Sequence, residues 1–153
     1  MEYTVEVKEI LPQPTAAIRA TTTEDAIGTT LAEILPEVWH YLAAIGVKPI
    51  GPPFTRYLSS RGGQVELEGG LPVAGPVPAR GRVQPAELPG GRVAVTWHVG
   101  PYDNLREAYE SLATWIQQQG LKPAGPPWEN YWTDPGKVPN PAEWRTEVIC
   151  PVK

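Results

Sequence analysis

Alternating apolar and polar positions divide the chain into short strands that flank two helical stretches. The alternation predicts strands at residues 3–9, 15–22, 54–59, 64–68, 80–86, 92–99, 129–133 and 144–152. Apolar residues recur with helical spacing at residues 27–45 and 105–119. The predicted order of elements is therefore β-β-α-β-β, followed by the same order again.

Proline and glycine residues indicate where the two predicted helices could be interrupted and where they end. Pro36 lies inside the first one, so the sequence allows either a kinked helix or a short helix that ends near Leu35 before a second begins. Gly46 and Gly120 follow the two stretches directly, where a glycine commonly caps the C-terminal end of a helix.

A twelve-residue stretch occurs twice. Residues 46–57 read GVKPIGPPFTRY and residues 120–131 read GLKPAGPPWENY, with seven identical positions at a constant spacing of 74 residues (120 − 46 = 74). A match of this length at a fixed spacing predicts an internal repeat. We expect one domain over residues 1–153, with repeat unit one at about 1–73 and repeat unit two at about 79–153.

After the repeated stretch, the two copies match at a different spacing. Pro72-Val73 matches Pro151-Val152 at a spacing of 79 residues (151 − 72 = 79), which makes Glu68 the counterpart of Glu147. Because Gly69 and Gly70 follow Glu68, we expect that carboxylate to be solvated.

The predicted fold class is α+β. Two β-β-α-β-β units related by a pseudo-twofold axis would form an antiparallel sheet with both helices on one side. A central cleft between the units is the place where a ligand site is expected.

Charge and composition narrow the classes of partner. The net charge is −4, and the scattered Lys and Arg residues argue against direct nucleic-acid binding, which needs clustered cations. The chain starts without a basic or apolar leader and has no apolar run long enough to span a bilayer, so we expect a cytoplasmic protein without a membrane partner. The single cysteine, Cys150, fits a reducing compartment.

Tryptophan and tyrosine dominate the aromatic residues, with six of each against one phenylalanine. Buried Tyr and Trp must also satisfy a hydroxyl or an N–H group, so ordinary core packing would use more Phe. The bias indicates an aromatic ligand surface. His40 and His98 have no partners at metal-ligand spacing, so the sequence predicts no metal site and no cofactor.

Two segments carry a family resemblance. Residues 95–105 read VTWHVGPYDNL, and residues 145–152 read RTEVICPV near the C-terminus. In this order, and with the duplication, they resemble the GyrI-like family, whose members include effector-binding domains of BmrR-type and some AraC-type regulators. Since the chain has no helix-turn-helix, we expect a stand-alone member.

The resemblance implies a duplicated fold with an aromatic pocket and a buried glutamate near the C-terminus, which is Glu147 here. A carboxylate in an apolar cavity could be the charge partner of a lipophilic cation. It could also be a general base, because some stand-alone relatives are similar to enzymes that hydrolyse cyclopropane-bearing DNA-alkylating natural products. The alternative is an ordinary surface glutamate beside buried Val148.

The candidate ligand-binding residues are one carboxylate and seven aromatic side chains, for each of which core packing is the alternative. They are Trp39, Tyr57, Trp97, Tyr109, Tyr131, Trp132, Trp144 and Glu147. If the protein is an enzyme, Glu147 and Tyr109 are the catalytic candidates.

Three functions are consistent with these features. The first is binding of lipophilic, aromatic, often cationic small molecules, by a monomer or weak dimer. The second is hydrolysis of cyclopropanoid alkylators on the same pocket. The third is a protein-interaction modulator of the gyrase-inhibitor type, which would expose an apolar patch.

Overall fold

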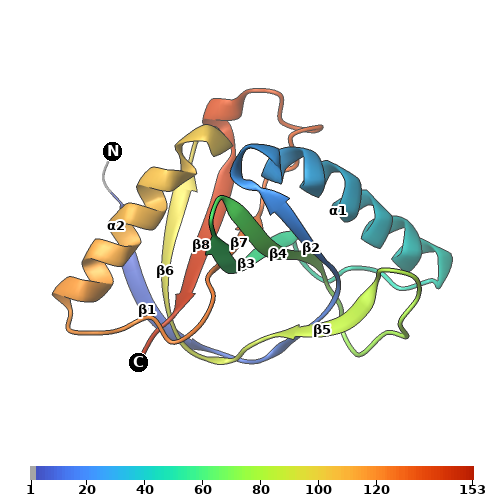
Figure 1. The fold of residues 1–153 in the computed structure, drawn as a ribbon, viewed down its shortest axis with the longest axis horizontal. Coiled ribbons are helices and arrows are strands. Elements are labelled where there is room, and N and C mark those ends of the chain that lie inside the picture. The colour runs from blue at the N-terminus through green and yellow to red at the C-terminus, as the bar shows by residue number, and fades with distance from the viewer. Residues whose placement is uncertain (1–2) are drawn as a thin grey trace. The chain divides into compact units, whose positions relative to one another are not determined.

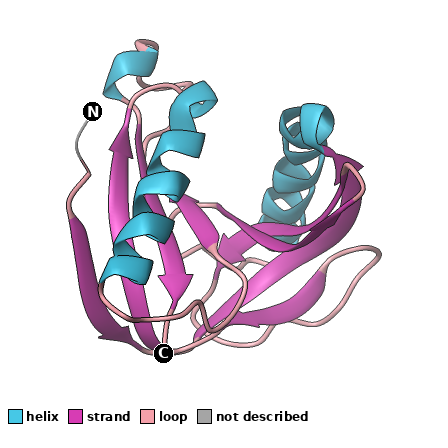
Figure 2. Cartoon of the chain, turned by 60° about the vertical axis from the view of Figure 1, so that its left-hand side comes forward, coloured by secondary structure: helices cyan, strands magenta, loops and turns pink. Residues whose placement is uncertain are grey.

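The chain forms two compact units, each built from an antiparallel sheet and one helix. The computed structural model describes residues 3–153. One unit contains the residues up to Ile10 together with Gly91–Lys153, and the other contains Leu11–Gly90. We call them the terminal unit and the internal unit. Figures 1 and 2 show each helix lying along the strands of its own unit.

The terminal unit has four strands in the order β1-β6-β8-β7, all antiparallel. They are β1 (Val5–Ile10), β6 (Gly91–Val99), β8 (Arg145–Pro151) and β7 (Trp128–Tyr131). Helix α2 (Leu105–Gln118) buries its apolar stripe of Leu105, Ala108, Leu112 and Ile116 against one face of this sheet. Ala94, Val148 and Cys150 supply the sheet side of the core.

The internal unit has the strand order β3-β4-β2-β5, again antiparallel. These strands are β3 (Phe54–Arg61), β4 (Gln64–Pro72), β2 (Gln13–Thr23) and β5 (Gln84–Leu88). Helix α1 (Ile27–Ala44) packs Ile34, Val38, Tyr41 and Leu42 against Ala16, Ile18 and Leu67. The α+β class with antiparallel strands is confirmed in both units.

The α1 helix is continuous through Pro36. Proline removes one backbone N–H, which leaves the carbonyl group of Ala32 without its helical partner. Both residues lie on the exposed side of the helix, where water can satisfy that carbonyl group. The stripe from Ile34 to Leu42 packs on the core on both sides of the proline, so the first of the two sequence alternatives, one helix, holds.

The glycine caps are confirmed, and the repeated stretches bond in corresponding ways. Gly46 and Gly120 have φ angles of +73° and +72°, which a glycine adopts without strain. After them, Ile50 N–H donates to the Pro72 carbonyl at 3.0 Å, and Ala124 N–H donates to the Pro151 carbonyl at 2.8 Å. Each Gly-Pro-rich stretch is therefore hydrogen-bonded to the last residue of a strand, β4 in one copy and β8 in the other.

One edge strand of each compact unit comes from the other sequence repeat. β1 precedes β2 in the chain but pairs with β6, in register Val7 with Ala94. β5 follows β4 and pairs with β2, in register Thr15 with Ala86. The compact units therefore differ from the sequence repeats, because the first strands of the two repeats, β1 and β5, are exchanged between the units.

Strand β4 is longer than the predicted segment 64–68, because Gly69 and Gly70 continue it. A Cβ atom at Gly70 would lie 2.1 Å from the Ala16 carbonyl oxygen, and one at Gly69 would lie 2.8 Å from the Ile34 side chain. The glycines thus permit close packing and do not end the strand. As a result, Glu68 is only 5% exposed and lies 3.4 Å from Arg19, so the expectation that it is solvated was wrong.

No helix within residues 3–153 is both long enough and apolar enough to cross a bilayer.

Candidate functional site

The two faces of the terminal unit's sheet carry two separate groups of polar and aromatic residues. Side chains alternate between faces along a strand, and Val148 and Cys150 of β8 pack against α2. Glu147 directly precedes Val148 and therefore points to the opposite face. On β7, the cross-strand register pairs Glu129 with Val148 and places it on the α2 face.

Glu129 is the buried carboxylate of the α2 face. It is 3% exposed, and its two oxygens accept hydrogen bonds from the hydroxyl groups of Tyr109 on α2, at 2.6 Å, and Tyr131 on β7, at 2.5 Å. Charge-assisted bonds of this length orient a carboxylate firmly.

Tyr102 and Trp144 extend this group into an aromatic cluster. The ring of Tyr102 lies edge-on to Tyr131 at 5.5 Å between centroids, and 4.9 Å from the indole of Trp144. Burial raises the pKa of Tyr102, and the negative charges of Glu129 and Asp134 raise it further. Two carboxylates, Glu129 and Asp134, therefore act electrostatically on this aromatic cluster.

Local sequence explains how these side chains meet. The short strand β7 follows the Gly-Pro-Pro connector, and its alternation puts Glu129 and Tyr131 on the same face. Tyr109 lies on α2 and packs against the core between helix and sheet. Gly100, with a φ angle of +141°, forms the turn that leads from β6 into Tyr102.

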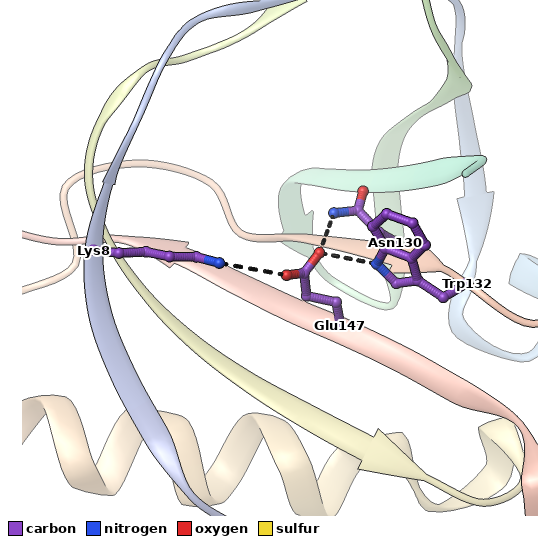
Figure 3. A network of polar contacts seen from close by, with 4 residues as sticks. All are labelled: Lys8, Asn130, Trp132 and Glu147. Atoms are coloured by element: carbon purple, nitrogen blue, oxygen red, sulfur yellow. Dashed lines mark hydrogen bonds and ion pairs between the residues drawn. The ribbon is translucent and has the colours of Figure 1, made fainter. Parts of the chain in front are cut away.

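Glu147 is the centre of the group on the opposite face. Its Oε1 atom accepts hydrogen bonds from Asn130 Nδ2 at 2.9 Å and Trp132 Nε1 at 3.1 Å, and Lys8 Nζ lies 3.9 Å from Oε2 (Figure 3). Trp97 is its cross-strand neighbour and contacts Trp132 at 6.2 Å between ring centroids. The carboxylate is 7% exposed and already has an ammonium partner within the chain.

The predicted site residues therefore divide into three sets. Tyr109, Tyr131 and Trp144 gather around Glu129, whereas Trp97, Trp132 and Glu147 lie on the opposite face of the same sheet. Trp39 and Tyr57 belong to the internal unit, where Trp39 is 54% exposed on α1 and Tyr57 packs against the core. The two catalytic candidates, Glu147 and Tyr109, are not brought together.

Glu129 and Tyr102 were absent from the sequence-predicted site. The 74-residue spacing did contain a signal for Glu129, because it aligns this residue with Thr55. The two are 3% and 0% exposed at corresponding places, so a charged residue occupies a position that the other copy fills with a small hydroxyl group. A charge at a buried position of a repeat is costly unless it has a role.

Neither carboxylate lines the hollow beside α2 in the terminal unit. That hollow, of about 350 Å³, lies between β1 and α2 and is lined by Tyr3, Val5, Glu110, Ser111, Thr114, Trp115 and Gln118. It lacks a buried charge and the convergent polar groups of a specific site, so we place the functional site by its chemistry at Glu129. Within residues 3–153, no three His, Cys, Asp or Glu side chains lie together as metal ligands would.

We expect Glu147 to contribute mainly to stability. The Glu147→Ala change leaves the Asn130 amide and the Trp132 indole N–H without their acceptor, so the free energy of unfolding should fall by about 1–3 kcal/mol. Urea titration measures this fall. The matched control is Glu110→Ala, whose carboxylate is 70% exposed and pairs with Arg106 on the same helix. Equal effects of both changes would refute a structural role for the Glu147 network.

Comparison with known proteins gives one family and several similar folds. The family model described as the GyrI-like small molecule binding domain matches residues 3–153. The crystal structure of the C-terminal domain of EcmrR is similar to the chain, with 25% identity, a TM-score of 0.86, and coverage of 100% of this chain and 99% of that one. No curated protein matches the chain.

Two further comparisons show the breadth of the fold. EcmrR in its complex with DNA matches at 24% identity and a TM-score of 0.85, over 99% of this chain. The chain spans only 57% of that EcmrR chain. A hydrolase from Listeria innocua shares the fold at 15% identity and a TM-score of 0.69, over 97% of this chain and 91% of its own.

Proposed function

Because the chain belongs to the GyrI-like family of small-molecule binding domains, we propose that it binds lipophilic, aromatic cations at Glu129 on the α2 face of the terminal unit. The observation that supports the proposal most strongly is the bonding of Glu129. A 3% exposed carboxylate is held by two phenol hydroxyl groups and surrounded by aromatic rings.

Electrostatics explain why a cation suits this site. A buried carboxylate interacts strongly with a nearby positive charge, because the local dielectric is lower than in water. The faces of aromatic rings also attract cations, by about 0.5–2 kcal/mol for each desolvated contact. A lipophilic cation with a delocalised charge loses little hydration on entering such a site, so both attractions contribute to affinity.

The aromatic cluster supports an aromatic ligand. Tyr102 contacts Tyr131 and Trp144 at centroid distances of 5.5 and 4.9 Å, and all three side chains are half-buried. Tyr and Trp give a large contact area at a low cost in side-chain entropy. Ring stacking tolerates many ligand shapes, so we propose a broad ligand range.

The geometry favours binding over hydrolysis by the residues that the sequence suggested. A hydrolase using Glu147 to activate water and Tyr109 to hold the substrate needs both on one side of the sheet. They lie on opposite faces, and both oxygens of Glu147 already have partners in Asn130, Trp132 and Lys8.

Calorimetric titration with tetraphenylphosphonium tests the proposed function. This cation is the ligand in the structure of SAV2435, which shares the fold at 13% identity and a TM-score of 0.68, over 100% of this chain and 94% of its own. We expect saturable binding, at least about tenfold tighter than that of the neutral triphenylphosphine oxide, because Glu129 attracts only the charged compound. Equal affinities, or no binding of the cation, would contradict a charge-selective site.

A further inference from the structure

His98 is a buried residue that the proposed binding chemistry does not use directly. It lies on β6, is 0% exposed, and has a partner at each ring nitrogen. Nε2 lies 2.9 Å from the carbonyl oxygen of Pro101, and Nδ1 lies 2.8 Å from the hydroxyl oxygen of Tyr3. The imidazole therefore connects the start of the described chain to the turn before α2.

The partners of His98 define its hydrogen-bonding roles. A carbonyl oxygen can only accept, so Nε2 carries the proton and donates to Pro101. In the neutral imidazole, Nδ1 is then the acceptor, and the Tyr3 hydroxyl donates to it. Both nitrogens are satisfied in one tautomer, and the rings of His98 and Tyr3 stack at 6.0 Å.

The turn that His98 holds leads directly to Tyr102. Gly100 N–H donates to the Trp144 carbonyl oxygen at 2.8 Å, and the His98 bond fixes the carbonyl group of Pro101. These two bonds attach the turn to Trp144, directly before β8, on one side and to β6 on the other. Tyr102 follows Pro101 and places its ring against Tyr131 and Trp144.

We propose that His98 is a positioning residue of the ligand site. By holding the Pro101 carbonyl group, it keeps Tyr102 in the aromatic cluster beside Glu129. Its effect on ligand affinity rests on the proposed function, whereas its effect on the placement of Tyr102 does not. A histidine that only fills space in the core would affect stability without a specific effect on Tyr102.

The ionisation of Tyr102 reports its placement without any ligand. Burial and the charge of Glu129 raise the pKa of this phenol above 10.0, so release of the ring lowers the pKa towards that value. NMR titration of tyrosine ring carbons measures it, and the Tyr102→Phe spectrum assigns the signal. We expect a lower pKa of Tyr102 in folded His98→Leu and His98→Asn, since neither donates where Nε2 does.

Two variants are matched controls. The His98→Gln side chain places an amide N–H near the Nε2 position, so it should preserve the Tyr102 pKa. Tyr3→Phe removes the bond at Nδ1 and leaves the Pro101 bond, so it should preserve that pKa as well. A wild-type pKa of Tyr102 in folded His98→Leu or His98→Asn would refute the proposal, as would a lowered pKa in His98→Gln equal to that in His98→Leu.

Affinity for tetraphenylphosphonium gives the second readout. We expect His98→Leu and Tyr102→Ala each to weaken binding by about fivefold, the loss of one aromatic contact. The double variant should bind as Tyr102→Ala does, because His98 acts through Tyr102. If the losses of affinity in the two single variants add up in the double variant, His98 does not act through Tyr102. If wild-type protein fails to bind the cation, the proposed function is wrong, and the Tyr102 titration still decides the role of His98.

Discussion

Glu129→Gln is expected to weaken tetraphenylphosphonium binding by roughly 30- to 150-fold, the largest effect of any single change at the site. The amide keeps the shape of the side chain: its oxygen can accept from one of the two phenols, and its NH2 group can donate to the hydroxyl oxygen of the other. It removes the negative charge, and losing one partner of a buried charge pair costs about 2–3 kcal/mol at the lower end of its range. Isothermal titration calorimetry measures the change.

Glu147→Gln is the matched control on the opposite face of the sheet. It removes the same charge from a carboxylate of similar burial, 7% against 3% exposed. Because Glu147 faces away from α2 and Tyr109, we expect the affinity to stay within about twofold of wild type. The reverse pattern, with a loss in Glu147→Gln alone, would support the sequence-based prediction of Glu147 and contradict a site at Glu129.

Gly70→Ala is expected to lower the free energy of unfolding by about 3 kcal/mol or more. The added Cβ atom would lie 2.1 Å from the Ala16 carbonyl oxygen and 2.8 Å from the Ala17 Cα atom, both of them backbone atoms. The clash therefore requires β2 and β4 to move apart, which side-chain rotation cannot avoid. For a chain of this size the melting temperature should fall by about 6–12 °C, as thermal unfolding would show.

Gly28→Ala is the control for this change. Gly28 lies in α1, and a Cβ atom there would meet nothing within 4 Å. Alanine is more favourable than glycine in a helix by about 0.5–1 kcal/mol, so the melting temperature should rise slightly. Equal stability of the Gly70→Ala and wild-type proteins would show that the β2–β4 contact is looser than described.

Hydrophobic periodicity was sufficient to predict the elements of the fold. Both helices and the strand segments follow from local spacing, which depends on the faces that strands and helices bury, and the two caps follow from the glycines that end the helical stretches. The pairing of β1 with β6 and of β5 with β2 did not follow from it. Alternation shows that a segment is a strand, but it carries no record of which edge the strand joins.

The candidate site was only partly predictable for a related reason. Tyr109, Tyr131 and Trp144 were identified as aromatic candidates, but sequence alone could not tell which of two carboxylates shares their face. Glu147 was favoured because the family resemblance implied a buried glutamate at this position, and its neighbours on β8 are apolar. Those neighbours, Val148 and Ile149, lie on opposite faces of the sheet, so an apolar flank does not indicate where Glu147 points. The cross-strand register makes that distinction.

Intermolecular NOE measurement on the tetraphenylphosphonium complex tests the central claim most directly. We predict contacts from the ligand's phenyl protons to the ring protons of Tyr109, Tyr131 and Tyr102, the aromatic side chains around Glu129. Contacts to Trp97 and Trp132, with none to Tyr109, would place the ligand on the Glu147 face and contradict the account.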